Sequence, residues 1–592
     1  MKKMQKIFAL VLTVSMLITV LAGCSGGDPD DRGAIIYMYL GADPSNINLD
    51  PAKMLFSSEA VKFIGLMFEG LTVMDDRGRL EGGMAKKWTI IENEERGIYR
   101  MHFELHDTRW SDGIPVTADD FVYAWKRILE PDFHSPAAPL LFDIKNARAV
   151  KEGEMTVDDL GVAALDLTLL EVTFERKIDY DRFLENVASI ALVPVRADTV
   201  DYEPETWAMS SNDPISLTLL SNGPFSIKQL DYNRGAMLER SIYYRLEGKR
   251  GENIMRFVRP YRIVLDFSRP LESQVDSFIT TNANSVPDEN NIFFLGDLPN
   301  ARFEGMRNQA DLREMLSAYT VHFNVNAAPL NRAEVRQALS IALDRNHIAN
   351  MVGLGVKPAT GIVPAGIVGE NATGSADFRQ ENGDLIVPGG NMNEARTLLS
   401  SAGVSGGSFG LKVRNDPVEL EVANYIAGVW NQLGFNVTVV PAQGRAYADA
   451  IFEVDYDAML FDFQATGVNA WSVLAPFAQP FSGSAKEFVP ELADYLPAPF
   501  ITGFQNDAYD ALIEEIFLID DKKERHAKLQ QAERMLVELS PIAPLYFNTS
   551  INISEKITGI TYSRFGFPQF ARATLRNHQN YTTTEAPREL VQ

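Results

Sequence analysis

Residues 410–440 read GLKVRNDPVELEVANYIAGVWNQLGFNVTVV and carry the clearest fold signal in the chain. Residues 410–413 fit a short strand, and residues 418–433 are long enough for a helix that Gly434 ends. Residues 435–440 are rich in β-branched side chains, which favours a second strand. Because parallel strands need a long crossover connection, the segment predicts a βαβ unit and therefore an α/β fold.

Further elements are expected on both sides of this unit. Residues 98–105 alternate between apolar and polar side chains, which predicts a half-buried strand. Thr117 and Asp120 fit a capping box at the start of a helix that Pro131 ends. The other expected elements are a strand at 456–463 and helices beginning at Asn331, at 393–402 with Gly403 after its end, near 507–518 and at 521–539.

The chain has 592 residues, of which 46% are apolar and 23% are charged. This composition is globular, and the length corresponds to about three to four structural units. The single cysteine excludes an internal disulfide and a cysteine-rich zinc site. The net charge of −24 excludes nucleic acid as a partner, because an acidic protein repels phosphate. Only the N-terminus has a long apolar run, which excludes a protein that spans the membrane several times.

The N-terminus resembles a bacterial lipoprotein signal. Three lysines within the first six residues precede an uncharged run at 7–20, which is shorter than the roughly 20 residues of a membrane-spanning helix. Residues 21–24, Leu-Ala-Gly-Cys, resemble a lipobox, in which the cysteine is lipidated and becomes the new N-terminus. We expect a signal peptide at 1–23 and a lipid anchor at Cys24; an ordinary secretory signal is the alternative.

Residues 24–34 are predicted to tether the folded body to this anchor. The stretch 25–32 is small and polar, which is typical of a flexible linker. Cleavage after residue 23 removes three lysines and no acids, so the mature chain carries a net charge of −27. Since bacterial membranes are anionic, we expect the body to stand off from the extracytoplasmic face of the cell membrane.

No motif in the sequence predicts catalysis. The nucleotide-binding patterns G-x-x-x-x-G-K and G-x-G-x-x-G and the hydrolase patterns H-E-x-x-H and G-x-S-x-G are absent. His102, Glu104 and His106 share one strand face, so a zinc or copper site is one hypothesis. Side chains at this spacing are too far apart to chelate one ion without other strands, and we interpret them as a solvated face. We expect no enzyme activity, no cofactor and no metal.

Aromatic side chains at strand ends are candidates for a ligand pocket. Most of the 34 phenylalanines, 19 tyrosines and 6 tryptophans are expected to pack in the core or on the surface. Phe461, Phe463, Tyr546 and Phe547 lie at predicted strand ends rather than inside helical stripes. These four side chains can therefore line a pocket between domains.

Several motifs along residues 35–575 resemble, in order, the oligopeptide/dipeptide/nickel-binding family of ABC-transporter solute receptors. The most recognisable is residues 110–125, WSDGIPVTADDFVYAW. The subtype that the chain resembles most is the oligopeptide-binding receptor. The other matching stretches are residues 49–51, 68–71, 85–88, 159–162, 170–173, 221–225, 323–324, 335–345, 395–403, 509–512 and 541–546.

The resemblance implies a periplasmic-binding-protein-like fold (type II, class C). Two lobes would close on a ligand, and an extra third domain would pack beside one lobe. The implied boundaries are a signal peptide at 1–23, a tether at 24–34, lobe I at 35–60, 196–315 and 541–592, the extra domain II at 61–195 and lobe II at 316–540.

The resemblance also implies a function. A lipid-anchored monomer would capture an extended peptide between its lobes and deliver it to the permease subunits of an ABC transporter. Main-chain pairing would supply affinity for any peptide sequence, because every peptide offers the same N–H and C=O groups. Closure would be a hinge motion stabilised by contacts to both lobes. The implied ligand-binding residues are Phe56, Ser57, Ser58, Asn282, Phe461, Asp462, Phe463, Gln464, Thr466, Tyr546 and Phe547.

The sequence departs from the pattern of the resembled receptors at Phe463, where those receptors have a tryptophan, at Thr466 and in residues 467–471. In oligopeptide receptors, the position of Thr466 holds an aspartate that takes the α-ammonium group of the peptide. A threonine hydroxyl accepts a hydrogen bond but does not neutralise a buried ammonium group. Either another acid such as Asp462 supplies the charge, or the ligand has no free amine there. Strand alternation places the Asp462 side chain opposite that of Phe463, which favours the second alternative.

Two other classes of function remain open on the sequence. The same fold can act as a sensor of a peptide, or as a receptor for another solute such as a metal complex. An extracellular hydrolase of peptides or glycans is the third class, and the missing catalytic motifs disfavour it.

Overall fold

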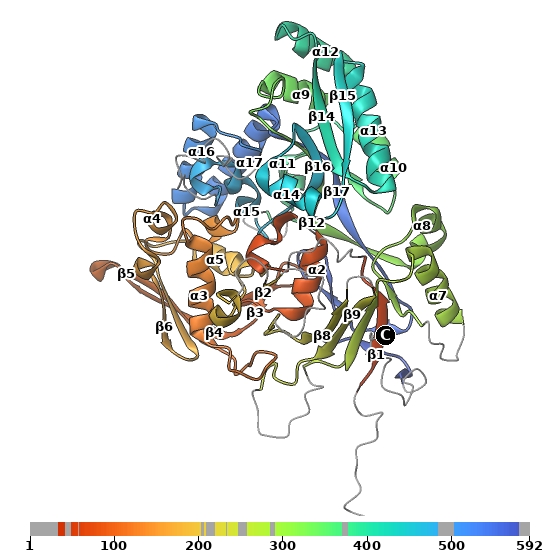
Figure 1. Cartoon of the computed structure of the whole chain (residues 1–592). Coiled ribbons are helices and arrows are strands. Elements are labelled where there is room, and N and C mark those ends of the chain that lie inside the picture. The colour runs from red at the N-terminus through yellow and green to blue at the C-terminus, as the bar shows by residue number, and fades with distance from the viewer. Residues whose placement is uncertain are drawn as a thin grey trace, which may run out of the picture.

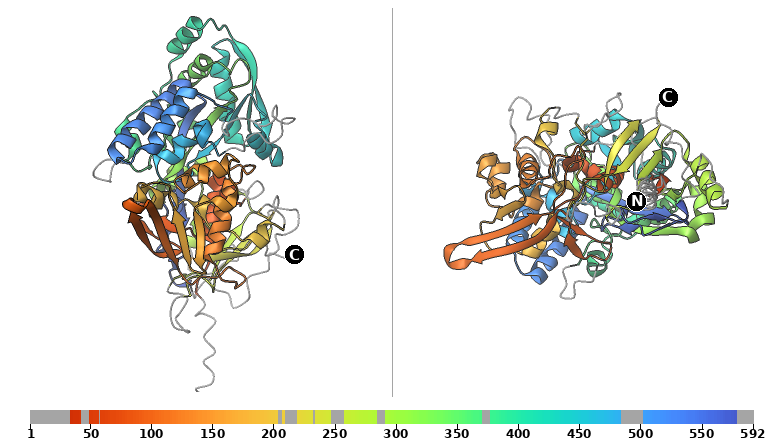
Figure 2. Two further views of the ribbon diagram at one scale, coloured as in Figure 1. Left: turned by 90° about the vertical axis from the view of Figure 1, so that its left-hand side faces the viewer. Right: turned by 90° about the horizontal axis from the view of Figure 1, so that it is seen from below.

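The computed structural model describes residues 33–41, 49–56, 58–202, 207–208, 219–231, 234–246, 257–283, 291–369, 377–483 and 502–578. An upper lobe stands on a lower lobe, and a further region lies beside the lower lobe (Figures 1 and 2). The predicted signal peptide, Cys24 and residues 24–32 of the predicted tether lie outside the described residues.

One mixed sheet of 11 strands runs through both lobes. In sheet order its strands are β15 (Phe435–Ala442), β14 (Gly407–Arg414), β16 (Ala458–Gln464), β12 (Ala310–Phe323), β17 (Ile542–Ile553), β11 (Phe294–Leu295), β1 (Ile35–Tyr39), β10 (Arg262–Asp266), β9 (Gly235–Arg240) and β8 (Phe225–Asp231), with β13 (Lys357–Pro358) paired to β17 off this path.

The long strands β12 and β17 connect the two lobes. They pair antiparallel from Ala310–Ile553 at the lower end to His322–Ile542 at the upper end. The upper half of β12 also pairs with β16, and the lower end of β17 pairs with β11. Because both strands belong to both halves of the sheet, the lobes share one hydrogen-bonded ladder.

The βαβ unit predicted from residues 410–440 is confirmed in the upper lobe. β14 and β15 are parallel, with Gly407 opposite Phe435, and the helix α13 (Pro417–Asn431) connects them. One apolar core joins this face of the sheet to α13 and to the helices α9 (Ala333–Ile341), α10 (Arg345–Val352) and α12 (Met392–Ser401). The remaining upper helices are α11 (Phe378–Asn382), α14 (Arg445–Glu453), α15 (Ala470–Leu474), α16 (Asp507–Leu518) and α17 (Lys522–Leu539).

The region beside the lower lobe is built on a four-stranded antiparallel sheet, β4-β5-β7-β6. Its strands are β4 (Ala85–Asn93), β5 (Ile98–Leu105), β6 (Val162–Asp166) and β7 (Leu169–Thr173). The β4–β5 hairpin projects from the body of the molecule (Figure 2). The helices of this region are α3 (Ala118–Leu129), α4 (Ala147–Lys151), α5 (Tyr180–Asn186) and α6 (Ala197–Val200).

Short elements complete the lower lobe. The helices are η3 (Pro51–Phe56), α2 (Ser58–Met67), α7 (Leu271–Ala283) and α8 (Asn300–Met306). The short strand pairs are β2 (Thr72–Met74) with β3 (Leu80–Gly82), β18 (Ile557–Thr558) with β21 (Thr574–Leu575) and β19 (Thr561–Tyr562) with β20 (Pro568–Gln569).

Most of the expected local elements are confirmed. The strand at 98–105 is β5, and the predicted capping box of Thr117 and Asp120 starts α3. The helix predicted to begin at Asn331 begins instead at Ala333. Asn331 belongs to the preceding turn, because its backbone N–H donates to the carbonyl of Ala327 at 2.8 Å.

The polar face of β5 forms ion pairs with its neighbours. His102 Nε2 lies 2.8 Å from Glu171 Oε2, and Glu104 Oε2 lies 2.7 Å from Lys87 Nζ. Within the described ranges, no group of three or more His, Cys, Asp or Glu side chains is arranged to hold a metal ion. The polar side chains of β5 are thus paired with charged side chains of the neighbouring strands.

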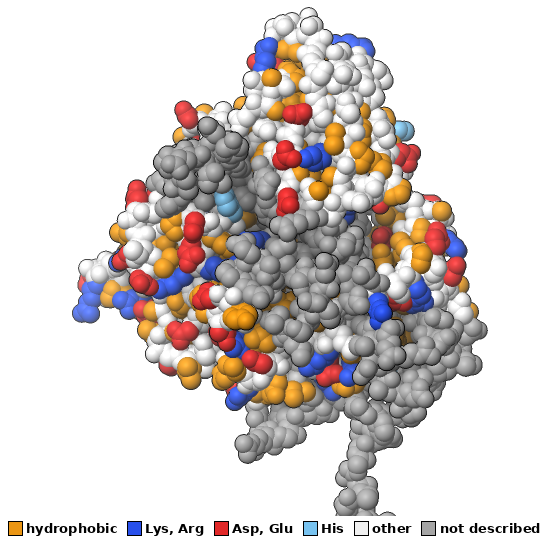
Figure 3. Space-filling model, in the orientation of Figure 1, with side chains coloured by type: hydrophobic (Ala, Val, Ile, Leu, Met, Phe, Trp, Pro, Cys, Tyr) orange, Lys and Arg blue, Asp and Glu red, His pale blue; other side chains and the backbone are white. Residues whose placement is uncertain are grey.

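Acidic and basic side chains are interspersed over the described part of the face shown in Figure 3. None of the described helices combines the length and the apolar character that crossing a bilayer requires. The domain boundaries implied by the sequence stay predictions; the one at 315/316 falls inside β12, and the one at 540/541 precedes β17.

A buried ion pair fixes the segment that leads into η3. Asp50 and Arg127 are 2% and 7% exposed. Two guanidinium nitrogens of Arg127 donate to the two carboxylate oxygens of Asp50 at 3.1 and 2.6 Å, and the backbone N–H of Ala52 donates to Asp50 at 3.1 Å. This bidentate pair links the N-terminal segment to α3 across 77 residues of sequence.

Replacement of this arginine should destabilise the protein strongly. In Arg127→Met the Asp50 carboxylate stays buried without its guanidinium, and we expect a loss of about 3–5 kcal/mol in the free energy of unfolding, measured by urea titration. The control is Arg302→Met, because the exposed Arg302 pairs with Glu272 and Asp276 at the surface. That change should cost less than about 1 kcal/mol, and equal losses in both variants would contradict the assignment.

Candidate functional site

Three neighbouring strands bring most of the predicted ligand-binding residues together. In the register of β16, β12 and β17, Asp462 lies opposite Tyr319, which lies opposite Tyr546. In the adjacent row, Phe463 lies opposite Ala318, which lies opposite Phe547. Residues that lie directly opposite each other on neighbouring strands share a face, and successive residues of one strand point to opposite faces. The first row therefore lies on one face of the sheet and the second row on the other.

The row of Asp462 forms a polar cluster with the N-terminus of α13. Asn548 Nδ2 donates to Asp462 Oδ1 at 2.8 Å and to Ser317 Oγ at 2.9 Å. The hydroxyl of Tyr319 donates to Glu419 Oε2 at 2.5 Å. The rings of Tyr319 and Tyr546 are stacked, with their centroids 5.3 Å apart. These hydrogen bonds and this stack hold two carboxylates, Asp462 and Glu419, beside one tyrosine pair.

The two carboxylates are only partly covered. Asp462 is half-buried, and 16% of the Glu419 side chain is exposed. Arg414, at the end of β14, lies with its Nε 3.4 Å from Glu419 Oε1. Burial raises the pKa of Glu419 to about 7; the positive charge of Arg414 and the hydrogen bond from Tyr319 lower it, and the negative charges of Asp462 and Asp416 raise it. Glu419 is therefore protonated more readily than an ordinary carboxyl group.

A second acid lies on the lower lobe and faces this region. Burial raises the pKa of Asp297, which follows β11, to about 6; the charge of Lys62 lowers it and the charge of Asp416 raises it. Asp416 is the N-cap of α13 in the upper lobe, and Lys62 belongs to α2 in the lower lobe. Charged groups of the two lobes therefore lie close enough to influence one another.

The opposite face of β16 is apolar. Phe461 stacks on His322 with the ring centroids 3.5 Å apart, and Phe463 contacts Phe477 at 5.6 Å between centroids. Both ring nitrogens of His322 are buried with no hydrogen-bond partner in the described part of the chain, and burial holds its pKa well below the ordinary value. Phe547 packs on Ala318 and Ala359. These aromatic residues are core side chains on this face.

The side chains of Gln464 and Thr466 form hydrogen bonds with backbone carbonyl groups of the protein. Gln464 is fully buried, and its Nε2 donates to the carbonyl of Leu316 at 3.0 Å. Thr466 is 2% exposed, and its hydroxyl donates to the carbonyl of Ser472 at 2.9 Å. The threonine hydroxyl thus closes the turn after β16.

The helix η3, which ends at Phe56, lies near this strand. Phe56 is the last residue of η3, which contacts β16, and Ser58 begins α2. Ser57 lies outside the described residues. The buried Asp50 at the start of η3 therefore positions a lower-lobe segment against the upper-lobe strand.

Asn282 is not part of this cluster. It lies near the end of α7, which contacts β11 at the outer edge of the lower lobe (Figure 1). Both polar atoms of its amide are buried without a hydrogen-bond partner among the described residues. Its role in ligand binding stays a prediction.

Sequence reasoning missed several members of the polar cluster: Ser317, Tyr319, Glu419 and Asn548. The position of Glu419 in the first turn of a predicted helix is a signal of a charged helix N-terminus. No local signal marks Tyr319 or Asn548, because their roles depend on the register between β12 and β17.

Comparison with known proteins identifies the family. The family model described as "Bacterial extracellular solute-binding proteins, family 5 Middle" matches residues 79–485. The probable deoxycholate-binding periplasmic protein YgiS of Escherichia coli (strain K12) is 27% identical over 547 residues, 91% of this chain and 90% of that protein. The dipeptide-binding protein DppE of Bacillus subtilis (strain 168) is 25% identical over 598 residues, 96% of this chain and 98% of that protein.

The fold recurs in solved structures. The crystal structure of Haemophilus influenzae OppA in complex with the peptide RPPGFSPFR superposes with a TM-score of 0.70 at 21% identity, covering 92% of this chain and 99% of that one. The fold is therefore that of the type II periplasmic-binding proteins, as the sequence predicts. The family consists of receptors that bind solutes and not of enzymes. The chain belongs to the bacterial extracellular solute-binding proteins of family 5.

Proposed function

We propose that this protein captures peptides between its two lobes and delivers them to the permease subunits of an ABC transporter. The observation that carries the proposal is the polar cluster on β16, β12 and β17, which places two partly exposed carboxylates beside the ladder that joins the lobes. The names of two similar proteins, the dipeptide-binding DppE and the peptide-bound OppA, support a peptide as the ligand.

In this proposal the peptide lies extended and pairs through its backbone with the segment of Phe56, Ser57 and Ser58 and with residues 461–464. Main-chain pairing is independent of peptide sequence, because every residue offers the same donor and acceptor. Tyr546 is proposed to shape the wall beside Asp462, whereas Phe461, Phe463 and Phe547 lie on the opposite face of the sheet. Lobe I comprises 35–60, 196–315 and 541–592, lobe II comprises 316–540, and domain II comprises 61–195.

The cationic end of the peptide is proposed to lie at Asp462 and Glu419. The sequence alone favours a ligand without an amine here, because Asp462 and Phe463 lie on opposite faces. The geometry supports the other alternative, because Asp462 shares its face with Glu419 rather than standing alone. Asp462 lies close enough to Glu419 for its charge to act on that carboxyl group, and an ammonium group beside both acids would be stabilised by their negative charge.

Loss of the Asp462 charge should weaken binding of peptides with a free amine. We expect Asp462→Asn to cost about 2 kcal/mol, roughly thirtyfold in Kd, for a free-amine peptide and little for its N-acetylated twin. Calorimetric titration of the matched pair measures this difference. The control is Asp455→Asn, since Asp455 is exposed and pairs with Lys412 at the surface. Equal affinity of the wild type for both peptides would overturn the ammonium site, and binding of deoxycholate but of no peptide would overturn the peptide ligand.

Binding should also depend on pH through Glu419. Its pKa of about 7 in the free protein means that the carboxyl group is increasingly protonated below neutrality. A cationic ligand prefers the ionised form, so the proton must leave on binding. Affinity should fall by up to about tenfold for each pH unit below pH 7, and it should fall again above about pH 8, because the α-amino group of the peptide, with an ordinary pKa of about 7.7–8.0, then loses its charge.

Titration of one free-amine peptide between pH 5.5 and 8.5 tests this dependence. Glu419→Gln keeps the shape of the side chain and removes the titrating group, so its affinity should be lower than that of the wild type at neutral pH and nearly constant between about pH 5.5 and 7, where the peptide amine stays charged. A wild-type affinity that does not change across this range would contradict a role for Glu419 in the site.

We further propose that the protein is a monomeric lipoprotein anchored through Cys24 at the outer face of the cell membrane. The lipobox-like residues 21–24 and the single cysteine support this anchor. Cys24→Ala should leave the protein unlipidated and release it from the membrane fraction, as measured by fractionation after salt and carbonate washes. A variant that stays in the membrane fraction at the wild-type level would show that the anchor lies elsewhere.

A further inference from the structure

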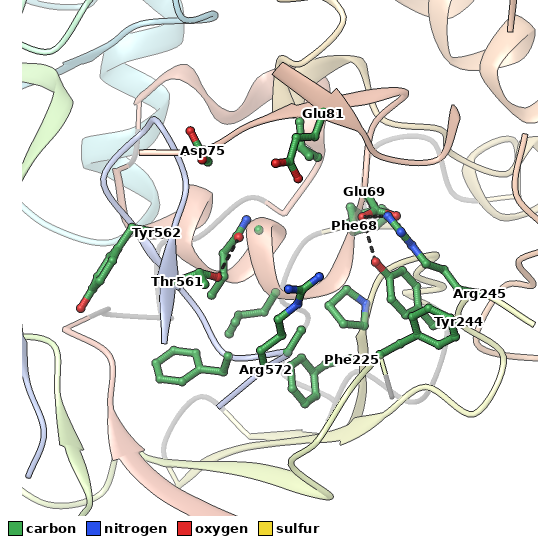
Figure 4. A pocket seen from close by; sticks show the side chains of 18 of the residues that line it. Phe68, Glu69, Asp75, Glu81, Phe225, Tyr244, Arg245, Thr561, Tyr562 and Arg572 are labelled. Atoms are coloured by element: carbon green, nitrogen blue, oxygen red, sulfur yellow. Dashed lines mark hydrogen bonds and ion pairs between the residues drawn. The ribbon is translucent and has the colours of Figure 1, made fainter. Parts of the chain in front are cut away.

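A cavity of about 350 Å³ lies in the lower part of the molecule, away from the polar cluster on β16. Three stretches that are far apart in the sequence line it (Figure 4): α2 to β3, the start of β8 with Tyr244, Arg245 and Phe257, and residues 561–572. None of the predicted peptide-binding residues is among its lining residues. Its volume lies within the range of about 300–1,000 Å³ that small-molecule sites occupy.

Part of the cavity wall is apolar. Phe68, Phe225 and Phe570 are each less than 5% exposed, and Phe257 and Met74 add to the same lining. Phe570 is held by an edge-to-face contact with Phe294, with the ring centroids 5.0 Å apart. These rings come from fixed elements of the lower lobe, so the wall is preformed for an apolar or aromatic group.

The charged lining residues are only partly paired. Arg79 and Asp75 form one ion pair at 2.6 Å, and Arg245 and Glu69 form a second at 2.9 Å. Glu69 also accepts a hydrogen bond from the hydroxyl of Tyr244 at 2.8 Å through Oε1. The other carboxylate oxygen, Oε2, is buried without a partner among the described residues. A buried acceptor in this state is costly, and a ligand donor would satisfy it.

Two further lining residues of opposite charge remain. Glu81 and Arg572 both line the cavity and are both exposed, and the charge of Glu81 also acts on Arg79. Arg572 enters from the side opposite Glu81, and its guanidinium group points into the cavity (Figure 4). The cavity therefore offers a cation on one side and carboxylate oxygens on the other, with phenylalanine rings between them.

We propose that this cavity is a second binding site, for a small zwitterion with an apolar side chain, such as a free amino acid. The ligand carboxylate pairs with the planar guanidinium group of Arg572, which suits two parallel hydrogen bonds. The ligand ammonium group lies against Glu81 and the free Oε2 of Glu69. The side chain packs on Phe225 and Phe570. Because the walls come from three distant stretches, an occupied cavity holds these stretches together.

Three related probes separate the features of this site. Phenylalanine carries both charges, N-acetylphenylalanine lacks the ammonium group, and phenylalanine amide lacks the carboxylate. We expect saturable one-to-one binding of phenylalanine by calorimetry, with each of the other two probes at least about tenfold weaker. No phenylalanine binding at concentrations up to about 10 mM, or equal binding of all three probes, would overturn the proposal.

Variants of the exposed charged residues locate the binding site. Arg572→Gln and Glu81→Gln should each weaken phenylalanine binding at least about tenfold and leave the melting temperature of the free protein unchanged. Arg576→Gln is the matched control, since this exposed arginine is not among the lining residues. Asp462→Asn should have no effect on phenylalanine.

Two results of this series would contradict the second site. Loss of phenylalanine binding in Asp462→Asn would place the amino acid in the cleft between the lobes, and unchanged binding in both cavity variants would place it elsewhere. Hydrogen exchange gives an independent measurement: phenylalanine should slow exchange in residues 65–82 of the wild type and not in Arg572→Gln. Unchanged exchange at saturation would also overturn the assignment.

Discussion

The antiparallel pairing of β12 with β17 is the constraint on which the rest of the structure depends. The ladder begins at Ala310 opposite Ile553 and ends at His322 opposite Ile542, so it passes from the lower lobe to the upper lobe without a change of partner. β16 attaches to one side of this pair and β11 to the other. Each lobe therefore has its own additional strands, while the backbone hydrogen bonds between β12 and β17 join the two lobes.

The polar cluster lies where this ladder is irregular. The register breaks between Glu314 and Ala318, and Ser317 and Asn548, which hydrogen bond to each other, belong to the break. The side-chain amide of Asn548 at this break donates to the carboxylate of Asp462 on β16 as well as to Ser317. The site and the connection between the lobes are thus parts of one local structure.

The local elements follow from local rules, which is why the sequence predicts them well. α3 starts at a capping box, and α16 was expected at the bounds that it has, because periodicity and helix-end signals act within a few residues. The polar cluster depends instead on contacts between distant segments. Tyr319 and Glu419 are 100 residues apart, and their hydrogen bond exists only because β12 and the start of α13 meet in the folded chain.

The difference between local rules and contacts of distant segments also explains which features of the predicted ligand site the sequence predicts. The alternation of β16 correctly separates Asp462 from Phe463, since strand geometry alone decides it. Whether Asp462 stands alone or beside a second acid depends on the packing of α13, which no pattern in residues 456–463 contains. The hydroxyl of Thr466 closes the turn to Ser472, and this hydrogen bond depends on the path of the chain after the strand.

The irregular point in the ladder also limits how the chain can vary in length. Between the pairs Glu314–Thr549 and Ala318–Phe547, β12 contains the three residues 315–317, whereas β17 contains only Asn548. The excess is an even number of residues, so Tyr319 and Ala318 keep the faces that regular alternation assigns to them. An insertion or deletion of one residue here would exchange those faces and send the tyrosine into the opposite core. At this point the fold therefore tolerates insertions or deletions only of an even number of residues. The tip of the β4–β5 hairpin at 94–97 tolerates an odd or an even number, because it lies outside the paired strands.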